Sequence, residues 1–116
     1  MLKYSIICIA AIVLSGVASA EVVGRWCDTP VPGYRGTDSV ISLAVDNSGK
    51  YSLLFVYGDG SSRTVKVRKD GSSYLTGNDF GEYYTTHATG RLSLYDNDGL
   101  IRTAMPTTAT SPKGCR

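Results

Sequence analysis

The sequence predicts an all-β protein with roughly eight short strands, which follow one another as an antiparallel up-and-down meander and close into a small barrel. Turn-forming residues recur at short, nearly even intervals, and the segments between them alternate apolar and polar side chains. No window after residue 20 has the apolar spacing of an amphipathic helix. A two-sheet β-sandwich is the alternative, because pattern alone does not separate the two architectures.

Clusters of turn-forming residues define where the predicted strands begin and end. Asn and Gly tolerate positive φ, and Asp hydrogen-bonds within its own turn, so clusters of these residues mark chain reversals. The clusters are Asp46-Asn47-Ser48-Gly49, Gly58-Asp59-Gly60, Asp70-Gly71, Gly77-Asn78-Asp79, Thr89-Gly90 and Asp96-Asn97-Asp98-Gly99. The strands they predict lie near 22–27, 38–46, 50–57, 62–69, 72–76, 81–87, 91–95 and 99–105.

The segments between the turns have the chemistry of strands. Ile41 and Leu43 alternate with small or polar residues, which places one face in a core and the other in water. Residues 64–68 and 91–95 repeat this pattern. The segment 51–57 is apolar on both faces and rich in aromatic residues, as is typical of a central strand.

The N-terminus has the three parts of a secretory signal. Lys3 gives a positive start, residues 6–14 form a short apolar run, and small residues lead to Ala20. We therefore expect a signal peptide at 1–20, cleaved after Ala20, and a single domain at 21–116.

The same segment predicts a protein that is periplasmic or secreted and has no stable membrane anchor. The apolar run is shorter than the roughly 20 residues that span a bilayer. A lipid anchor would need a cysteine at the cleavage point, where the sequence has Glu21.

Two cysteines remain after cleavage, because Cys8 leaves with the signal. In an oxidising compartment, Cys27 and Cys115 are expected to form a disulfide, and two free thiols are the alternative. Such a bridge would enclose nearly the whole domain and bring the first strand beside the tail.

Charge argues against a nucleic-acid partner. Cleavage leaves 11 basic and 10 acidic residues, and the basic ones are scattered rather than gathered on one face. The local group Lys66, Arg68 and Lys69 is interpreted as the solvent face of a strand. We expect a monomer.

No catalytic, metal or cofactor constellation stands out, so we expect a protein that is not an enzyme. His87 is the single histidine, which excludes a histidine-pair zinc site, and its place beside a turn favours a rim residue over a general base. Asp96-Asn97-Asp98-Gly99 lacks the closing glutamate of a calcium loop and is explained by a hairpin turn.

The mature chain is rich in tyrosine, which suits a wet pocket or a protein interface. Our hypothesis is an exported, non-enzymatic binding module for a small ligand or an envelope component. Its ligand-binding residues would be Tyr51, Phe55, Tyr57 and Tyr83, with Tyr34 on a covering loop. A solidly filled interior would count against such a pocket.

The alternative hypothesis is an inhibitor or partner-binding protein. It would insert an exposed loop, such as residues 29–37 or 77–81, into the cleft of a protein target.

Two short motifs resemble known families of small barrels. Gly24-Arg25-Trp26 resembles the Gly-x-Trp of the lipocalin and avidin group, which implies that Trp26 closes the barrel floor and that Arg102 covers the indole. Ser48-Gly49-Lys50-Tyr51 resembles, with one residue fewer, the Ser-Gly-x-x-Tyr motif of periplasmic inhibitors of c-type lysozyme. The second resemblance implies inhibition of a lysozyme.

Overall fold

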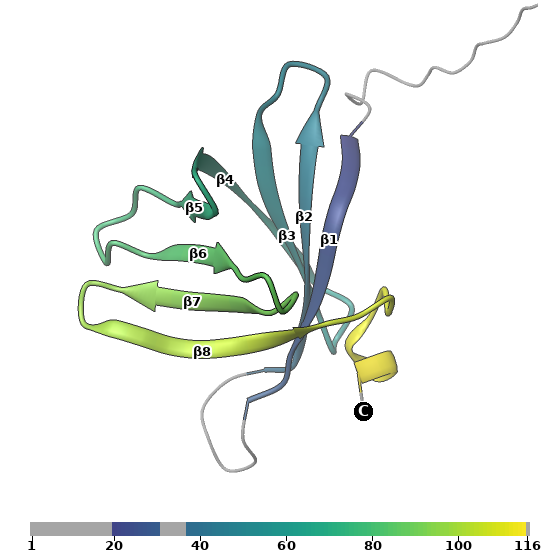
Figure 1. The fold of residues 1–116 in the computed structure, drawn as a ribbon. Coiled ribbons are helices and arrows are strands. Elements are labelled where there is room, and N and C mark those ends of the chain that lie inside the picture. Colours follow the sequence, from purple (N-terminus) through teal and green to yellow (C-terminus); the bar gives the residue numbers. More distant parts are fainter. Residues whose placement is uncertain (1–19, 31–36, 116) are drawn as a thin grey trace, which may run out of the picture.

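The computed structural model describes residues 20–30 and 37–115 (Figure 1). Nearly all of the predicted signal peptide, and Tyr34 on the first loop, lie outside the described residues. The elements are β1 (Ala20–Asp28), β2 (Ser39–Asp46), β3 (Tyr51–Tyr57), β4 (Ser62–Asp70), β5 (Ser73–Leu75), β6 (Tyr83–Thr86), β7 (Leu92–Asp96), β8 (Gly99–Pro106) and the 3-10 helix η3 (Pro112–Cys115). Among the described residues, no helix is both long and apolar enough to cross a bilayer.

Each strand pairs antiparallel with the next one in the chain, and β8 pairs with β1 to close a barrel. The closing contact is narrow: Trp26 pairs with Pro106 and Cys27 with Met105. The predicted all-β meander and its closure are therefore confirmed, and the sandwich alternative is wrong. The predicted strands agree with the observed ones because their turns lie where the sequence places them.

β4 connects two halves of the barrel whose strands cross rather than align. Its first part pairs with β3 as far as Val67, and its last part pairs with β5 from Arg68 onward. Figure 1 shows β1, β2 and β3 standing roughly upright, while β6, β7 and β8 lie across the view. The two halves therefore face each other around one core.

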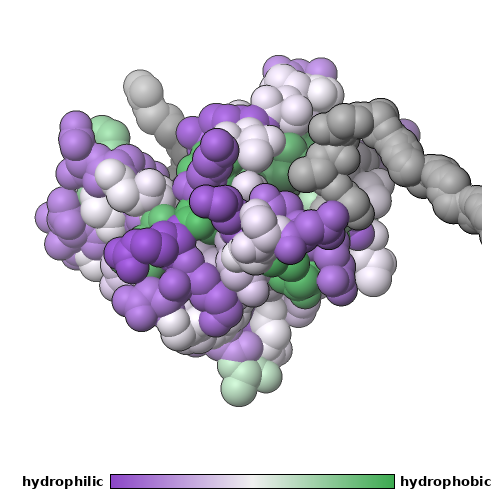
Figure 2. Space-filling view, turned by 90° about the horizontal axis from the view of Figure 1, so that it is seen from above, coloured by the Kyte–Doolittle hydropathy of each residue, from purple (hydrophilic) through white to green (hydrophobic). Residues whose placement is uncertain are grey.

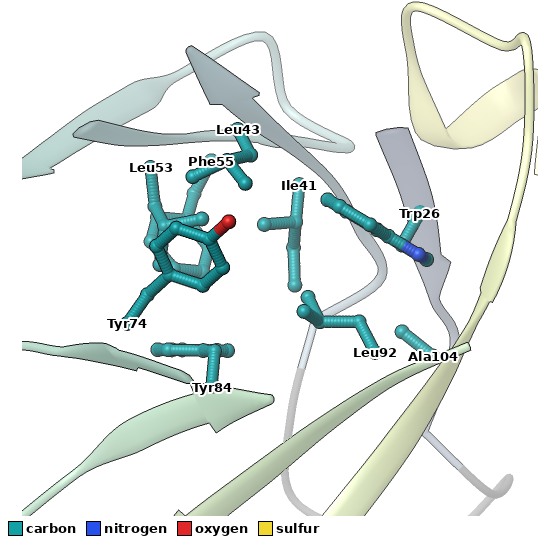
Figure 3. Packing of buried hydrophobic residues seen from close by; sticks show 9 residues of the cluster. All are labelled: Trp26, Ile41, Leu43, Leu53, Phe55, Tyr74, Tyr84, Leu92 and Ala104. Atoms are coloured by element: carbon teal, nitrogen blue, oxygen red, sulfur yellow. The ribbon is translucent and has the colours of Figure 1, made fainter. Parts of the chain in front are cut away.

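Side chains from both halves of the barrel point inward and form the core (Figure 3). The period-two alternation of the sequence supplies them, since alternate residues of a strand point to the same face. The buried cluster consists of Trp26, Ile41, Leu43, Leu53, Phe55, Tyr74, Tyr84, Leu92 and Ala104.

The Gly-x-Trp segment has a direct steric basis. Residues two apart on a strand share a face, and the indole of Trp26 folds back over Gly24, where a Cβ would lie 2.5 Å from the ring. A register shift between Val22 and Gly24 accompanies this contact. The indole Nε1 donates to the carbonyl oxygen of Gly90 at 2.7 Å, so the buried ring has its polar atom satisfied.

Gly24→Ala is therefore expected to lower the free energy of unfolding by about 1–3 kcal/mol, as overpacking in a filled core does. Urea denaturation would measure the change. Gly58→Ala is the control, because a Cβ there meets nothing within 4 Å. Equal denaturation midpoints for the two variants would contradict this expectation, because they would mean that the Trp26 ring moves away from the added Cβ without loss of stability.

The predicted disulfide is confirmed: the sulfurs of Cys27 and Cys115 are bonded at 2.01 Å. The bridge ties η3 to β1. Just after β8, the chain pairs with β1 at one more position, where the backbone nitrogen of Thr107 donates to the carbonyl oxygen of Arg25 at 2.9 Å. Pro112 of η3 is buried, so the tail is part of the folded domain.

Candidate functional site

Among the described residues, the barrel interior has little free space. A cavity of about 10 Å³ is lined mainly by Tyr84, Leu94 and Arg102 together with core residues. That volume holds roughly one water molecule, whereas pockets for small ligands measure about 300–1,000 Å³. A ligand of ordinary size would have to bind at the barrel surface or at one of its ends.

Three of the five predicted ligand-binding residues share one face of β3. Phe55 is buried in the core, and Tyr51 and Tyr57 are half-buried and pack against the core cluster. Phe55 and Tyr57 stack with their ring centroids 6.5 Å apart, and the rings of Phe55 and Tyr84 are tilted by 56° with centroids 6.0 Å apart. The structure therefore brings these residues together as packing partners.

The other two predicted residues are not part of this group. Tyr83 precedes the buried Tyr84 on β6, so it points to the outer face, where it stacks on Tyr95 with centroids 4.9 Å apart. Tyr34 lies outside the described residues. The four of these residues that the structure describes are thus not gathered around one cavity.

An ion pair lies at the edge of the core. Nε of Arg102 donates to Oδ1 of Asp28 at 2.9 Å, and Nη2 of Arg102 donates to Oδ2 of Asp28 at 2.8 Å. Asp28 is only 7% exposed. This hydrogen bonding raises the pKa of Arg102, and burial raises the pKa of the neighbouring Tyr84 to about 12.

The Gly-x-Trp resemblance implies that Arg102 covers the indole of Trp26. In the structure the guanidinium of Arg102 binds Asp28. Over the described part of the chain, two other cations lie above rings: Arg63 is 4.9 Å from the centroid of Phe55, and Lys69 is 5.7 Å from that of Tyr74.

His87 takes part in a chain of hydroxyl groups on the outer face. Its Nε2 lies 2.8 Å from Oγ of Ser93, which lies 3.2 Å from Oγ1 of Thr103. Ser93 is only 4% exposed, and no carboxylate among the described residues hydrogen-bonds to His87. The pair therefore lacks both the accessible nucleophile and the orienting acid of an acyl-transfer site. Residues 20–30 and 37–115 hold no group of three or more metal-ligating side chains.

The most exposed aromatic residue of the described chain stands on a loop held by internal hydrogen bonds. We call residues 76–82 the Phe80 loop, after the ring at its tip, which is 69% exposed. Oδ1 of Asn78 accepts from the backbone nitrogens of Phe80 and Glu82, each at 3.1 Å. Thr76 donates to the carbonyl oxygen of Glu82 from both its backbone nitrogen, at 3.1 Å, and its hydroxyl, at 2.9 Å.

The β7–β8 turn supports this loop from outside. The backbone nitrogen of Asn97 donates to the carbonyl oxygen of Phe80 at 2.9 Å. Gly81, at φ +65°, packs so closely on the side chain of Asn97 that a Cβ there would overlap it. The backbone under the Phe80 ring is thus held by two separate segments.

A row of apolar side chains crosses the outer face beside the Phe80 loop. Tyr83 pairs with Leu75 and Tyr95, and Tyr95 pairs with Leu100, so one residue of each strand from β5 to β8 contributes. Paired residues point to the same side of a sheet, and Leu100 is 59% exposed. The Phe80 loop and the β7–β8 turn together carry four carboxylates: Asp79, Glu82, Asp96 and Asp98.

A second surface feature is a groove of about 640 Å³ at one rim of the barrel. It is formed by the β2–β3 turn, the start of β3 and residues 66–69 of β4, and we call it the rim groove. Tyr51 lines it, so one predicted ligand-binding residue does border an open site.

Sequence reasoning named the loop 77–81 but not the Phe80 ring within it, and it missed Asp28. Phe80 stands alone among polar turn residues, outside any alternating run, and this isolation is the signal that could have identified it. Asp28 ends β1 as the first charged residue after an inward-facing Trp26, but its partner is 74 residues away, so only the folded chain identifies the pair.

The fold and these surfaces define a small, disulfide-closed antiparallel β-barrel with a filled interior. Comparison with known proteins adds no relative: no family model, curated protein or solved structure matches the chain.

Proposed function

We propose that this chain is an exported, non-enzymatic binding protein that recognises a protein target through the Phe80 loop. One observation carries the proposal: a phenylalanine ring that is 69% exposed on a loop fixed by hydrogen bonds from both sides. The Cys27–Cys115 bridge supports export, because disulfides persist in oxidising compartments.

Burying such a ring against a partner is worth roughly 2–3 kcal/mol, and interfaces commonly depend on a few aromatic anchors of this kind. A loop that is already ordered loses little conformational entropy when it binds. The Tyr83–Tyr95 stack and Leu100 add apolar surface next to the anchor. These features favour the loop-insertion hypothesis over a ligand held inside the barrel.

The expected target is a protein with an apolar pocket and a basic rim. The Phe80 loop and the β7–β8 turn carry four carboxylates. Neither residues 76–82 nor residues 96–100 include a lysine or arginine. Complementary charge speeds encounter and fixes orientation. The resemblance to inhibitors of c-type lysozyme makes such a lysozyme the first target to test.

Phe80→Ala is expected to weaken target binding by about 10- to 100-fold, the range for losing one anchor residue. Titration calorimetry and a cell-wall lysis assay with c-type lysozyme would measure it. Met105→Ala is the matched control, since Met105 is 52% exposed on a different part of the surface. Equal binding by the two variants would contradict the role of Phe80.

Cross-linking can identify a target other than lysozyme. A photoreactive phenylalanine analogue at position 80 of the secreted protein should give an adduct with one basic partner, and the same analogue at position 105 should not. Identical adducts at both positions, or none at either, would reject the Phe80 loop as the binding surface.

The hypothesis of a small ligand or envelope component keeps one specific observation in its favour. The rim groove is an open site of suitable volume, and the predicted Tyr51 lines it.

A further inference from the structure

The rim groove exists because β4 leaves one half of the barrel for the other. Tyr51 is paired with Val67, but the next residue of β4, Arg68, pairs with Leu75 of β5. The β2–β3 hairpin and the β4–β5 hairpin therefore diverge from this point. The groove of about 640 Å³ lies in the corner between them.

Four cations line this corner, and one carboxylate lies among them. The cations are Lys50, Lys66, Arg68 and Lys69. The carboxylate belongs to Asp46, whose Oδ1 accepts from the backbone nitrogens of Ser48 and Lys50 at 2.9 and 3.0 Å and from the hydroxyl of Ser48. These hydrogen bonds lower the pKa of Asp46 and engage it within its own turn.

Among the described residues, none of the four cations forms an ion pair with a carboxylate, although Lys50 interacts electrostatically with Asp46. In the part of the chain that the structure describes, the ion pair is that of Arg102 with Asp28, and neither Lys50, Lys66 nor Arg68 forms one. Lys69 is held in place because its Nζ donates to the carbonyl oxygen of Gly71 and lies over the Tyr74 ring. Cations that line a concave surface without an ion-pair partner favour an anionic ligand.

One aromatic residue borders the same site. Tyr51 lines the groove and also packs against the core, with its ring centroid 5.4 Å from that of the buried Tyr74. An aromatic ring beside cations offers an apolar surface to the carbon face of a sugar while the cations bind its acidic groups. Seen from above, this end of the molecule is mainly hydrophilic, with hydrophobic residues visible only in small areas between (Figure 2). That surface suits a polar ligand better than an apolar one.

From these observations we propose that the rim groove binds an acidic oligosaccharide, whose carboxylate or sulfate groups contact Lys50, Lys66 and Arg68 while a sugar ring lies against Tyr51. This assigns a role to the group that the sequence presents only as the solvent face of a strand. The proposal is independent of the Phe80 loop, which lies at the β5–β6 connection.

Titration calorimetry with the mature protein tests it. Hexamers of galacturonate and of sulfated glycosaminoglycan should bind, and neutral maltohexaose should not. Lys66→Ala/Arg68→Ala should weaken acidic-saccharide binding about tenfold or more, because two exposed charge contacts are lost. The control Arg91→Ala/Lys113→Ala removes the same net charge elsewhere and should bind as the wild type does. Both pairs are exposed, and circular dichroism checks that each variant is folded.

Each contrary result overturns the proposal in a distinct way. Equal weakening in the control pair would mean that net charge alone attracts the ligand. Equal binding of maltohexaose would remove the role of the acidic groups, and equal competition by inorganic phosphate would remove the role of the sugar. Tighter binding of a single-stranded oligonucleotide would identify a nucleic-acid surface instead. Phe80→Ala should leave saccharide binding unchanged, which separates this test from that of the proposed function.

Discussion

A Cys27→Ser/Cys115→Ser variant is expected to lose about 4–5 kcal/mol of unfolding free energy, the largest effect of any change considered for this protein. The two cysteines are 88 residues apart, so the bridge restricts almost the whole domain in its unfolded state. In the chain-entropy relation, stabilisation rises with the length of the closed loop. Small domains have net stabilities of about 5–15 kcal/mol, so the variant should be close to unfolding at physiological temperature.

Urea denaturation of the oxidised wild type and of the double variant measures this loss directly. Reduction of the wild type should reproduce it, and the same reductant should leave the double variant unchanged. A loss below about 1 kcal/mol would mean that the narrow pairing of Trp26 and Cys27 with β8 closes the barrel without help.

The strands could be predicted because the information that defines them is local. Asp46 shows this at one turn: its carboxylate binds the backbone of Ser48 and Lys50 within four residues, and the chain reverses there whatever the rest of the fold does. Asp59 does the same with Ser61, at 2.9 Å. Once the turns are known, the period-two pattern defines the strands between them.

Which side of a strand faces the core was harder to predict where both faces are apolar or aromatic. Tyr83 and Tyr84 have the same side chain, so composition cannot say which of them is buried. In the structure Tyr84 belongs to the core and Tyr83 stacks on Tyr95 outside, because the register with β7 places Leu94 opposite Tyr84. The predicted pocket included Tyr83, the member of this pair that lies outside the core.

The candidate surfaces depend on contacts between segments far apart in the sequence. The Phe80 loop is supported by Asn97, and the rim groove combines the β2–β3 turn with the end of β4. No spacing rule links these segments. The sequence could therefore suggest exposed loops and a basic group, but their shape follows from where β4 changes its partner.

The second large effect concerns the ion pair of Asp28 and Arg102. Arg102→Met is expected to lower the free energy of unfolding by roughly 2–4 kcal/mol, because it leaves a carboxylate buried without its donors. The lower part of this range allows for Arg102, whose side chain is 37% exposed while that of Asp28 is 9% exposed. Thermal and urea denaturation would measure the loss.

A double variant separates charge from packing at this site. Asp28→Leu/Arg102→Met removes both charges and keeps similar apolar volume, so it should be more stable than Arg102→Met alone, as expected when the cost comes from an unpaired buried charge. If both variants lost the same free energy, the contribution of Arg102 would lie in the packing of its aliphatic stem beside Tyr84 and Leu94. In that case the ion pair of Asp28 and Arg102 would form when the barrel closes but would not itself stabilise the closed barrel.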